Sequence, residues 1–364
     1  MNEFATTIYD IVIIGAGPAG AFFAMELAKA RPNLKIALID GQASGLPKPC
    51  GGLLSSDAQK FLAQNNLVLP KNILDDPQIF AVKTIDIRQK LVRTYQRHYI
   101  NMNRLAFDKW LLSLVPSTVE VCQGRCVAIS KENELYKLWI SFGDNKRKMV
   151  AKKLVGADGA GSIVRRTFFT PVKVQYMAIQ QWFKIDDENT PPYSCIFDGN
   201  ISSGCFWTIH KTGHVVLGGA FERNGAREAF EVMKSKLEGF LGCSFGSAVK
   251  TEACLVSSPR RPSDFCTGNE SIFLIGEAAG LISSSSFEGL SSAMISGKKL
   301  ADAFCSAKSV IQIQKCYRRK IRTLRIKLLL KVIKRLLIFT PFTRYLIMKS
   351  GIQSIDSTKK QNLF

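Results

Sequence analysis

The sequence is poor in the side chains that most metal centres and nucleophilic triads require. It contains only three histidines and no G-x-S-x-G motif, so a serine or cysteine triad has little support. Its ten cysteines include no paired CxxC motifs, which argues against a zinc site and against a secreted disulfide framework. His210 and His214 are four residues apart, but the KTG between them is typical of a hairpin turn, so we expect no metal there.

Long hydrophobic runs and targeting signals are also missing. No stretch approaches the roughly eighteen consecutive apolar residues of a membrane-spanning helix. The N-terminus, MNEFATTIYD, carries acidic residues and lacks the basic region and the long apolar run of a signal peptide. We therefore expect a protein of the reducing cytoplasm, whose contact with a membrane is at most peripheral and on the inner face of the cell membrane.

The first apolar segment of the chain is followed by a glycine-rich turn. Residues 9–14, YDIVII, are typical of a buried strand, GAGPAG follows at once, and AFFAMELAKA has the pattern of a helix. In such a unit Gly15 allows the tight turn, Gly17 lets the backbone approach a pyrophosphate, and Gly20 lets the helix pack on the strand. Asp40, at the end of the next apolar run, is spaced to accept hydrogen bonds from a ribose.

The complete pattern favours a dinucleotide-binding site over a turn of purely structural role. The start of the helix offers backbone N–H groups and the positive end of the helix dipole to the phosphates. An acid at the ribose position favours FAD or NAD over NADP. The predicted cofactor-binding residues of this segment are Gly15, Gly17, Pro18, Ala19, Gly20 and Asp40.

Two later segments distinguish FAD from NAD. Residues 152–166, KKLVGADGAGSIVRR, and residues 271–297, SIFLIGEAAGLISSSSFEGLSSAMISG, each run from a buried strand into a turn that contains glycine. Taken singly, each is compatible with an ordinary strand-to-turn transition. Taken in this order after GAGPAG, they resemble the three FAD fingerprints of the aromatic-hydroxylase-like flavoprotein superfamily. The resemblance implies FAD as the cofactor.

The same resemblance implies roles for individual residues. In that superfamily the acid of the third fingerprint, here Glu277, binds the ribityl chain of the flavin, and the following helix N-terminus faces the pyrophosphate. Aspartate is more usual at this position. The FAD-binding residues that the second and third fingerprints imply are Asp158, Gly159, Gly276, Glu277, Ala278, Gly280, Gly289 and Leu290.

The segment KPCGG, residues 48–52, narrows the resemblance. A cysteine followed by two glycines after the second strand is similar to the geranylgeranyl-reductase branch, whose members saturate carbon–carbon double bonds of isoprenoid chains. FEGLSSAMISG, residues 287–297, resembles a glycine-rich helix start of that branch, and CFWTIHK keeps only Trp207 of its YxWxFP motif. This likeness implies reduction of a prenyl substrate by hydride from reduced flavin, with NAD(P)H or another reductant as electron donor.

Such a reaction suggests catalytic roles for the KPCGG residues. Hydride adds to one alkene carbon, so the other carbon needs a proton, which the thiol of Cys50 could supply. Gly51 and Gly52 would let the backbone approach the isoalloxazine ring, and Lys48 could stabilise negative charge on the reduced flavin. The alternative for Cys50 is a small packed hydrophobe, in which case only the glycines matter.

Three aromatic side chains are candidate substrate contacts. Trp182, Phe206 and Trp207 lie on probable strands of a second domain, where they form either ordinary core or the lining of a prenyl-chain tunnel. Two other functions stay open at this point. One is an FAD-dependent monooxygenase or halogenase, which shares the three fingerprints, and the other is an FAD-bearing protein that binds a prenyl or membrane ligand without turnover.

The positive charge is concentrated near the C-terminus. The formal net charge is +21, and residues 303–355 contain thirteen lysines and arginines but no aspartate or glutamate. Aliphatic residues alternate with them at near-helical spacing, which predicts a basic amphipathic helix. Such a helix favours an anionic membrane surface as partner. A solvated face on a helix packed against the protein is the alternative. Nucleic acid is disfavoured because recognition motifs and base-stacking aromatics are missing.

Together these patterns predict an α/β protein. We expect a Rossmann-like FAD-binding domain with a parallel sheet, a mainly antiparallel β substrate domain and a C-terminal helical region. The expected segments are residues 1–75, 100–170 and 255–305 for the FAD-binding domain, 76–99 and 171–254 for the substrate domain, and 306–364 for the basic helical region.

Overall fold

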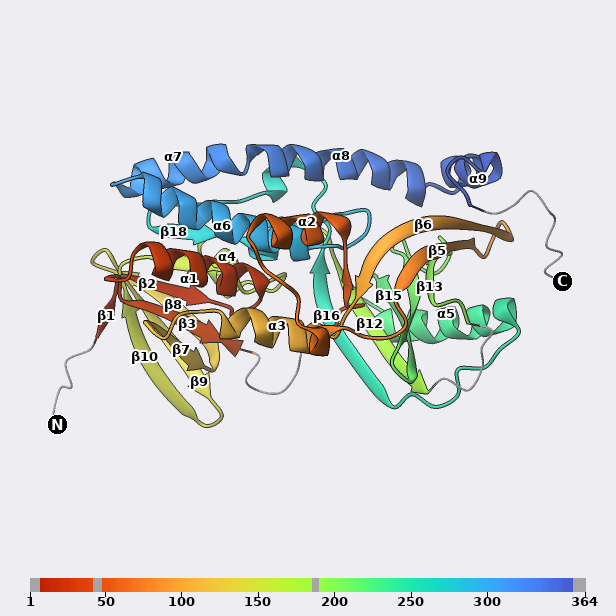
Figure 1. Ribbon diagram of the computed structural model, residues 1–364, viewed down its shortest axis with the longest axis horizontal. Helices are drawn as coiled ribbons and strands as arrows, with labels where there is room; N and C mark the ends of the chain where they lie inside the picture. Colours follow the sequence, from red (N-terminus) through yellow and green to blue (C-terminus); the bar gives the residue numbers. More distant parts are fainter. Residues whose placement is uncertain (1–6, 42–47, 185–189, 356–364) are drawn as a thin grey trace. The chain divides into compact units, whose positions relative to one another are not determined.

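The computed structural model describes residues 7–41, 48–184 and 190–355, and the chain divides into two compact units (Figure 1). The first unit contains Met1–Lys48, Leu105–Val174 and Ser257–Val332. The second contains Pro49–Arg104, Gln175–Val256 and Ile333–Phe364. Each unit is therefore assembled from segments that are far apart in the sequence.

The first unit is built on a six-stranded sheet in the order β17-β18-β11-β2-β3-β7. Its strands are β2 (Ile11–Ile14), β3 (Ile36–Asp40), β7 (Val119–Gln123), β11 (Leu154–Gly156), β17 (Gly268–Asn269) and β18 (Ile272–Leu274). All pairings from β18 to β7 are parallel, and only the short β17 pairs in the antiparallel sense. Every residue of β2, β11 and β18 is buried, as is typical of parallel strands covered on both faces.

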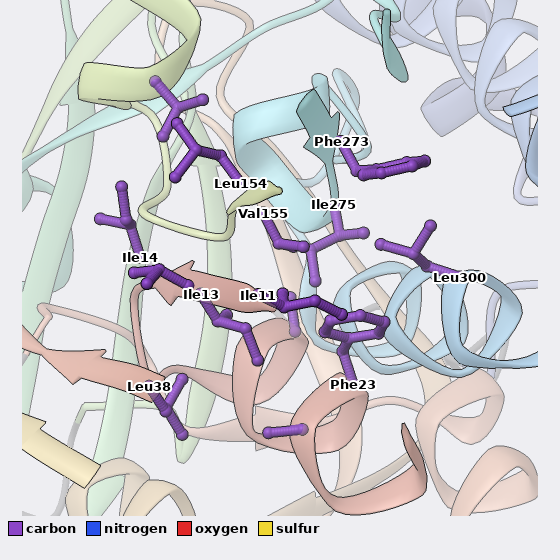
Figure 2. Packing of buried hydrophobic residues seen from close by; sticks show 14 of the residues in the cluster. Ile11, Ile13, Ile14, Phe23, Leu38, Leu154, Val155, Phe273, Ile275 and Leu300 are labelled. Carbon is purple, nitrogen blue, oxygen red and sulfur yellow. The ribbon is translucent and has the colours of Figure 1, made fainter. Parts of the chain in front are cut away.

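The helices of the first unit begin with α1 (Pro18–Ala30), which lies beside α6 (Leu290–Ser306) in Figure 1. Gly297 allows this close approach, because a Cβ there would lie 2.5 Å from the carbonyl oxygen of Ala19. Phe23 of α1 and Leu300 of α6 join Val155 of the sheet in one buried cluster (Figure 2). The core therefore holds the two helices against each other, and both helix starts belong to the predicted FAD-binding motifs.

A second sheet of the first unit has the order β1-β10-β9-β8. Its strands are β1 (Ile8–Tyr9), β8 (Arg125–Glu132), β9 (Leu135–Phe142) and β10 (Asn145–Ala151). Tyr136, Leu138 and Ile140 alternate along β9 and are fully buried in the same core as the parallel strands. This alternation shows that one face of the antiparallel meander covers the parallel sheet. The helices α3 (Arg104–Ser113), α4 (Ile163–Phe168) and α7 (Val310–Lys320) complete this part of the chain.

The second unit is built on an eight-stranded sheet in the order β16-β12-β15-β14-β13-β5-β6-β4. Its strands are β4 (Leu53–Leu54), β5 (Ile79–Asp86), β6 (Leu91–Asn101), β12 (Gln175–Lys184), β13 (Tyr193–Phe197), β14 (Phe206–Lys211), β15 (His214–Phe221) and β16 (Lys250–Ser257). From β12 to β4 the ladders are antiparallel except for the parallel pair β5 and β13. The expected mainly antiparallel sheet is confirmed, as is the hairpin between His210 and His214.

One face of this eight-stranded sheet is covered by α5 (Ala226–Leu241). Phe183, Phe206 and Leu217 point from the sheet into the core that Phe230 and Met233 of α5 complete. Successive residues of a strand point to opposite faces, so Trp182, Trp207 and their neighbours two residues away occupy the other face. That second face carries most of the predicted substrate and catalytic residues of this unit.

The remaining helices are α2 (Ser56–Gln64), α8 (Arg322–Phe339) and α9 (Pro341–Ser350), with 3-10 turns η2 (Lys71–Ile73), η3 (Pro262–Asp264) and η4 (Gly276–Ala279). The C-terminal region is helical, as expected, but it is divided into α7, α8 and α9. Lys320 ends α7 and Arg322 begins α8, so the predicted basic residues do not share one helix.

The units differ from the expected domain segments in two places. Residues 49–75 were expected with the FAD-binding domain, but β4 pairs with β6, and this segment belongs to the second unit. The basic region is not a separate body, because the division between the units falls within α8. Within the second unit, Arg344 of α9 forms a buried ion pair with Asp86 of β5, with Nε and Oδ2 at 2.7 Å. Long-range pairings of this kind leave no local signal in the sequence.

Candidate functional site

The carboxyl ends of the central parallel strands meet at one edge of the first unit. Ile14, Gly156 and Leu274 are neighbours across β2, β11 and β18. Asp40 ends the adjacent strand β3, which pairs in parallel with β2. The turns after β2, β11 and β18 contain the three predicted FAD fingerprints, so segments far apart in sequence are brought together here. Parallel α/β sheets bind nucleotides outside this edge.

The glycines of the first fingerprint shape the start of α1. Gly15 has φ +106°, and a Cβ there would lie 2.5 Å from the carbonyl oxygen of Ala157. A Cβ at Gly20 would lie 1.9 Å from the carbonyl oxygen of Gly15, whereas a Cβ at Gly17 would meet no atom within 4 Å. The helix starts at Pro18, and no side chain of the described residues caps it, so its first backbone N–H groups are not taken up by a capping side chain. This geometry fits the pyrophosphate of a dinucleotide.

Only one of the two carboxylate oxygens of Asp158, in the second fingerprint, accepts a hydrogen bond from the described residues. Its Oδ2 accepts a hydrogen bond from the backbone N–H of Ile163 at 2.6 Å. Its Oδ1 is buried and has no hydrogen-bond partner within residues 7–41, 48–184 and 190–355. Burial raises the pKa of this carboxyl group. A buried unpaired oxygen is costly, so the position fits a cofactor that donates hydrogen bonds, as the hydroxyls of FAD do. Gly159 follows with φ +74°.

Glu277 of the third fingerprint is held by two groups of its own unit. Its Oε2 forms an ion pair with Nζ of Lys48, and its Oε1 accepts a hydrogen bond from the backbone N–H of Ser257 at 2.8 Å. Each carboxylate oxygen has a further lone pair, so a ribityl hydroxyl could still donate to Glu277. The expected role of Lys48 beside the flavin stays a prediction, because Glu277 already compensates its charge.

The turn of the third fingerprint is held by two side chains outside the predicted set. The backbone N–H of Gly276 donates to Oγ of Ser296 at 2.8 Å. Nη1 of the buried Arg165 donates to the carbonyl oxygen of Ala278 at 3.1 Å, and Gly280 follows with φ +78°. The sequence analysis assigned no role to Arg165. Its burial, which no local pattern indicates, makes it a support for this turn.

The predicted glycine-rich helix start is the start of α6. Gly289 is the N-cap and Leu290 the first helical residue. A Cβ at Gly289 would lie 3.5 Å from the side chain of Ile282, which is ordinary contact. Space alone therefore does not require glycine at this position.

In the second unit, the CGG segment lies on the sheet face opposite α5. A Cβ at Gly51 would lie 2.5 Å from Cδ1 of Ile209 in β14. Gly52 has φ +64°, and a Cβ there would lie 2.2 Å from the carbonyl oxygen of Met102. The backbone N–H of Gly52 donates a hydrogen bond to Sγ of the half-buried Cys50 at 3.5 Å. This contact holds the sulfur of Cys50 against the backbone of its own segment.

The buried ammonium group of Lys211 holds the backbone around this segment. Its Nζ donates to Oδ1 of Asn101 at 2.5 Å, to the carbonyl oxygen of Met102 at 2.9 Å and to that of Gly52 at 3.4 Å. The carboxylate of Asp75 is 3.7 Å from Nζ. Burial lowers the pKa of Lys211 to about 8 despite the opposing effect of Asp75. Sequence reasoning missed Lys211, because all these partners lie on other segments of the chain.

The two predicted substrate tryptophans lie on this same sheet face. A Cβ at Gly218 would lie 2.5 Å from the ring of Trp207, so the ring lies across the glycine. Nε1 of Trp207 is buried and has no partner in the described part of the chain. Nε1 of Trp182 donates to Oε2 of Glu252 at 2.9 Å. The face therefore offers broad aromatic surface in a partly open environment.

Phe206, the third predicted substrate contact, lies on the other face. It is fully buried under α5 and stacks on Phe221 with ring centroids 5.3 Å apart. This position leaves no surface for a ligand, so Phe206 is a core residue of the second unit.

The structure thus groups the predicted residues by unit. The FAD-binding set and Lys48 belong to the first unit, whereas Cys50, Gly51, Gly52 and the tryptophans belong to the second. Among the described residues, no group of three or more His, Cys, Asp or Glu side chains is placed to hold a metal ion. No helix of the described chain is both long and apolar enough to cross a membrane.

Solved structures of other proteins share this fold, and one family profile matches part of the sequence. A geranylgeranyl bacteriochlorophyll reductase-like protein from Thermoplasma acidophilum matches with TM-score 0.76 and 19% identity, over 97% of this chain and 93% of that chain. A p-nitrophenol 4-monooxygenase from Pseudomonas putida matches with TM-score 0.72 and 14% identity, over 95% and 93%. The family profile described as lycopene cyclase protein matches residues 10–183.

The fold is therefore one that a reductase-like protein and a monooxygenase share. At the level of sequence, the chain is 41% identical over 357 residues to protein CbrA of Escherichia coli O6:H1 (strain CFT073), covering 96% of each. The chain therefore belongs to the CbrA family.

Proposed function

We propose that this protein uses FAD to reduce carbon–carbon double bonds of a polyprenoid or prenyl-lipid substrate, with NAD(P)H or another reductant as the source of electrons. Two of the comparisons point to isoprenoid chemistry by name. One is the geranylgeranyl bacteriochlorophyll reductase-like structure, and the other is the lycopene cyclase profile. A monooxygenase shares the fold, so the fold alone does not choose between reduction and hydroxylation, and the proposal depends on the residues around Cys50.

The residues of the parallel-sheet edge are suited to hold FAD. The first turn of α1 after Gly17 would bind the pyrophosphate, Asp40 the ribose, and Asp158 and Glu277 hydroxyl groups of the cofactor. When bound and reduced, FAD supplies a hydride for addition to an alkene carbon.

The observation that carries the proposal is the environment of Cys50. Saturation of a double bond needs a proton at the second carbon, and a thiol is a competent general acid. The N–H of Gly52 lies 3.5 Å from Sγ, and the buried ammonium group of Lys211 donates to the carbonyl oxygen of Gly52 at 3.4 Å, so the thiol is held in place by its own segment. Cys50 is therefore the proton donor of the reaction.

The sheet face beside Cys50 fits an apolar chain. Ile209 and the ring of Trp207 lie two residues apart on β14, and Gly218 leaves room for that ring. Aliphatic and aromatic side chains that line such a surface bind isoprene units by burial of apolar area, about 25 cal/mol per Å². The few polar groups there would orient the chain.

The decisive experiment follows the oxidation state of bound FAD. The purified protein is reduced anaerobically and mixed with a prenyl lipid, and the lipid is then analysed by mass spectrometry. Reoxidation without oxygen and a mass gain of two hydrogens support the proposal. Reoxidation by oxygen alone, accelerated by a ligand, would instead identify a monooxygenase or halogenase. Binding of lipid without any reoxidation would identify a ligand-binding flavoprotein.

The role of Cys50 is tested by substitution. Cys50→Ala should slow single-turnover oxidation by the prenyl lipid by about 10²–10⁴-fold while the FAD content stays unchanged. The matched control is Cys305→Ala, because Cys305 is exposed and lies in the other unit. An unchanged single-turnover rate in Cys50→Ala would remove the proton-donor role.

A further inference from the structure

An apolar stripe runs along the exposed side of α8. Ile326, Leu330, Ile333 and Leu337 are all exposed, Leu330 by 59% of its surface. At 3.6 residues per turn these four side chains lie within about 60° of one another around the helix axis. A soluble helix normally turns such a stripe toward its own core. In α8 it faces outward.

The opposite side of α8 shows that this orientation is fixed. Leu328 is buried, and half a turn away from the stripe Arg335 is buried as well. Nη2 of Arg335 donates to the hydroxyl of Tyr176 at 2.9 Å and to the carbonyl oxygen of Ser203 at 2.8 Å. The helix cannot rotate its stripe inward without breaking these bonds to a buried cation, which is costly.

The exposed apolar surface continues beyond α8. Phe342 and Leu346 lie one turn apart on α9, and Phe342 is exposed by 69% of its surface. The buried ion pair of Arg344 with Asp86 anchors the other side of α9. More than half of the exposed large hydrophobic side chains in the described residues fall between residues 326 and 355. Such a concentration marks an interaction surface.

The charges around the stripe indicate what this surface binds. Lys327 and Lys334 are exposed and lie along one flank of the stripe in α8, and Lys349 is exposed on α9. No acidic residue occurs between positions 303 and 355. Two copies of this chain that met through the stripe would bring like charges together, which opposes self-association. Aliphatic side chains bordered by lysines instead match the acyl chains and headgroups of an anionic lipid bilayer.

We propose that the exposed side of α8 and α9 docks this protein on an anionic membrane surface. The stripe enters the interface between headgroups and acyl chains, and the lysines contact the anionic headgroups. The helices lie in the plane of the interface. Docking depends on this surface alone, so it can hold even if the substrate differs from the one proposed above.

The test uses the full chain with FAD bound and lipid vesicles of two compositions. One set contains phosphatidylcholine alone, and the other contains phosphatidylcholine mixed with phosphatidylglycerol. Binding is measured by cosedimentation at low and at high salt. We expect binding to the mixed vesicles, weakened but not abolished by salt, because salt screens the charges and leaves the apolar contact.

Two double variants separate the two contributions. Lys327→Gln with Lys334→Gln should weaken binding to mixed vesicles roughly thirtyfold, since each basic residue near an anionic surface contributes about a factor of five. Leu330→Gln with Leu337→Gln should weaken binding by more than about tenfold even at high salt. The matched control is Ile311→Gln on α7, where an aliphatic residue that is even more exposed lies outside the stripe. Glutamine preserves helix propensity, and circular dichroism checks that each variant is folded.

Three results would overturn the docking surface. The first is that the wild-type protein does not bind the mixed vesicles. The second is that the leucine double variant binds them as tightly as the control variant does. The third is a dimer of the wild-type protein that the leucine double variant abolishes, which would assign the stripe to a second copy. Vesicle binding requires no turnover, so its failure is distinguishable from failure of the proposed reaction.

Discussion

The buried Lys211 makes a prediction about how stability depends on pH. The substitution Lys211→Met removes the ammonium group that donates to Asn101, Met102 and Gly52 and keeps an unbranched side chain of similar length. Because burial lowers the pKa of Lys211 from 10.5 to about 8, the folded protein releases this proton at a lower pH than the unfolded chain does. Between these two pH values the unfolded state binds more protons, so the free energy of unfolding rises with pH.

The size of this effect follows from the difference in pKa. About 2.5 units at about 1.36 kcal/mol each correspond to about 3 kcal/mol, gained as the pH rises from about 8 to about 10.5. The side chain of Lys211 is only 4% exposed, so solvent screening reduces this figure little. The wild-type protein should gain this increment over that range, and Lys211→Met should lack it.

The assay is urea unfolding followed by circular dichroism at several pH values, with the wild-type protein and the variant measured side by side. The quantity to compare is the difference in the free energy of unfolding between wild type and variant at each pH. Buried thiols such as Cys122, whose pKa burial raises to about 11, make this free energy fall as the pH rises, but they do so equally in both proteins. Lys184→Met, at an exposed position of the same sheet, is the control and should keep the wild-type slope. Equal pH slopes in wild type and Lys211→Met would refute the reasoning.

Three further substitutions test the sites separately. Gly20→Val places side-chain atoms against the carbonyl oxygen of Gly15, so the purified protein should contain little FAD; a normal flavin-to-protein ratio would contradict the cofactor site. Gly218→Ala puts a Cβ into the ring of Trp207 and should raise KM for a prenyl substrate more than it lowers kcat, as steady-state kinetics would show. Asp86→Ala leaves Arg344 buried without its carboxylate, which should cost about 3–5 kcal/mol and expose α9 to limited proteolysis; an unchanged cleavage pattern would argue against the anchoring role.

The predicted FAD fingerprints could be found in the sequence because their constraints are local. Gly15 and Gly20 are required by backbone atoms within a few residues or in the adjacent turn, and a strand, a glycine turn and a helix follow one another directly. The parallel register of β2, β11 and β18 then places the three fingerprints at one edge, which agrees with the α/β fold expected from their order. The family membership follows from similarity along nearly the whole chain.

The supporting residues could not be found in this way. Lys211 has its partners at positions 52, 75, 101 and 102, more than a hundred residues away, and β14 looks like an ordinary strand in the sequence. Phe206 and Trp207 are consecutive aromatic residues, and only the position of α5 decides which of them is covered. Of the two alternatives stated for Phe206, ordinary core holds, and the sequence could not choose between them because it does not show which sheet face a later helix will bury.

The sequence by itself determined the glycine turns that predict an FAD site, the order of strands and helices around them, and the basic, aliphatic character of the C-terminal region. Only the tertiary structure decided which side of α8 faces outward, which arginines of that region form buried hydrogen bonds and ion pairs, and which side chains surround Cys50. The physical reason is the range of the interactions. Turn geometry and helix periodicity act over a few residues, whereas burial, ion pairing and the choice of sheet face depend on segments that meet only when the chain has folded.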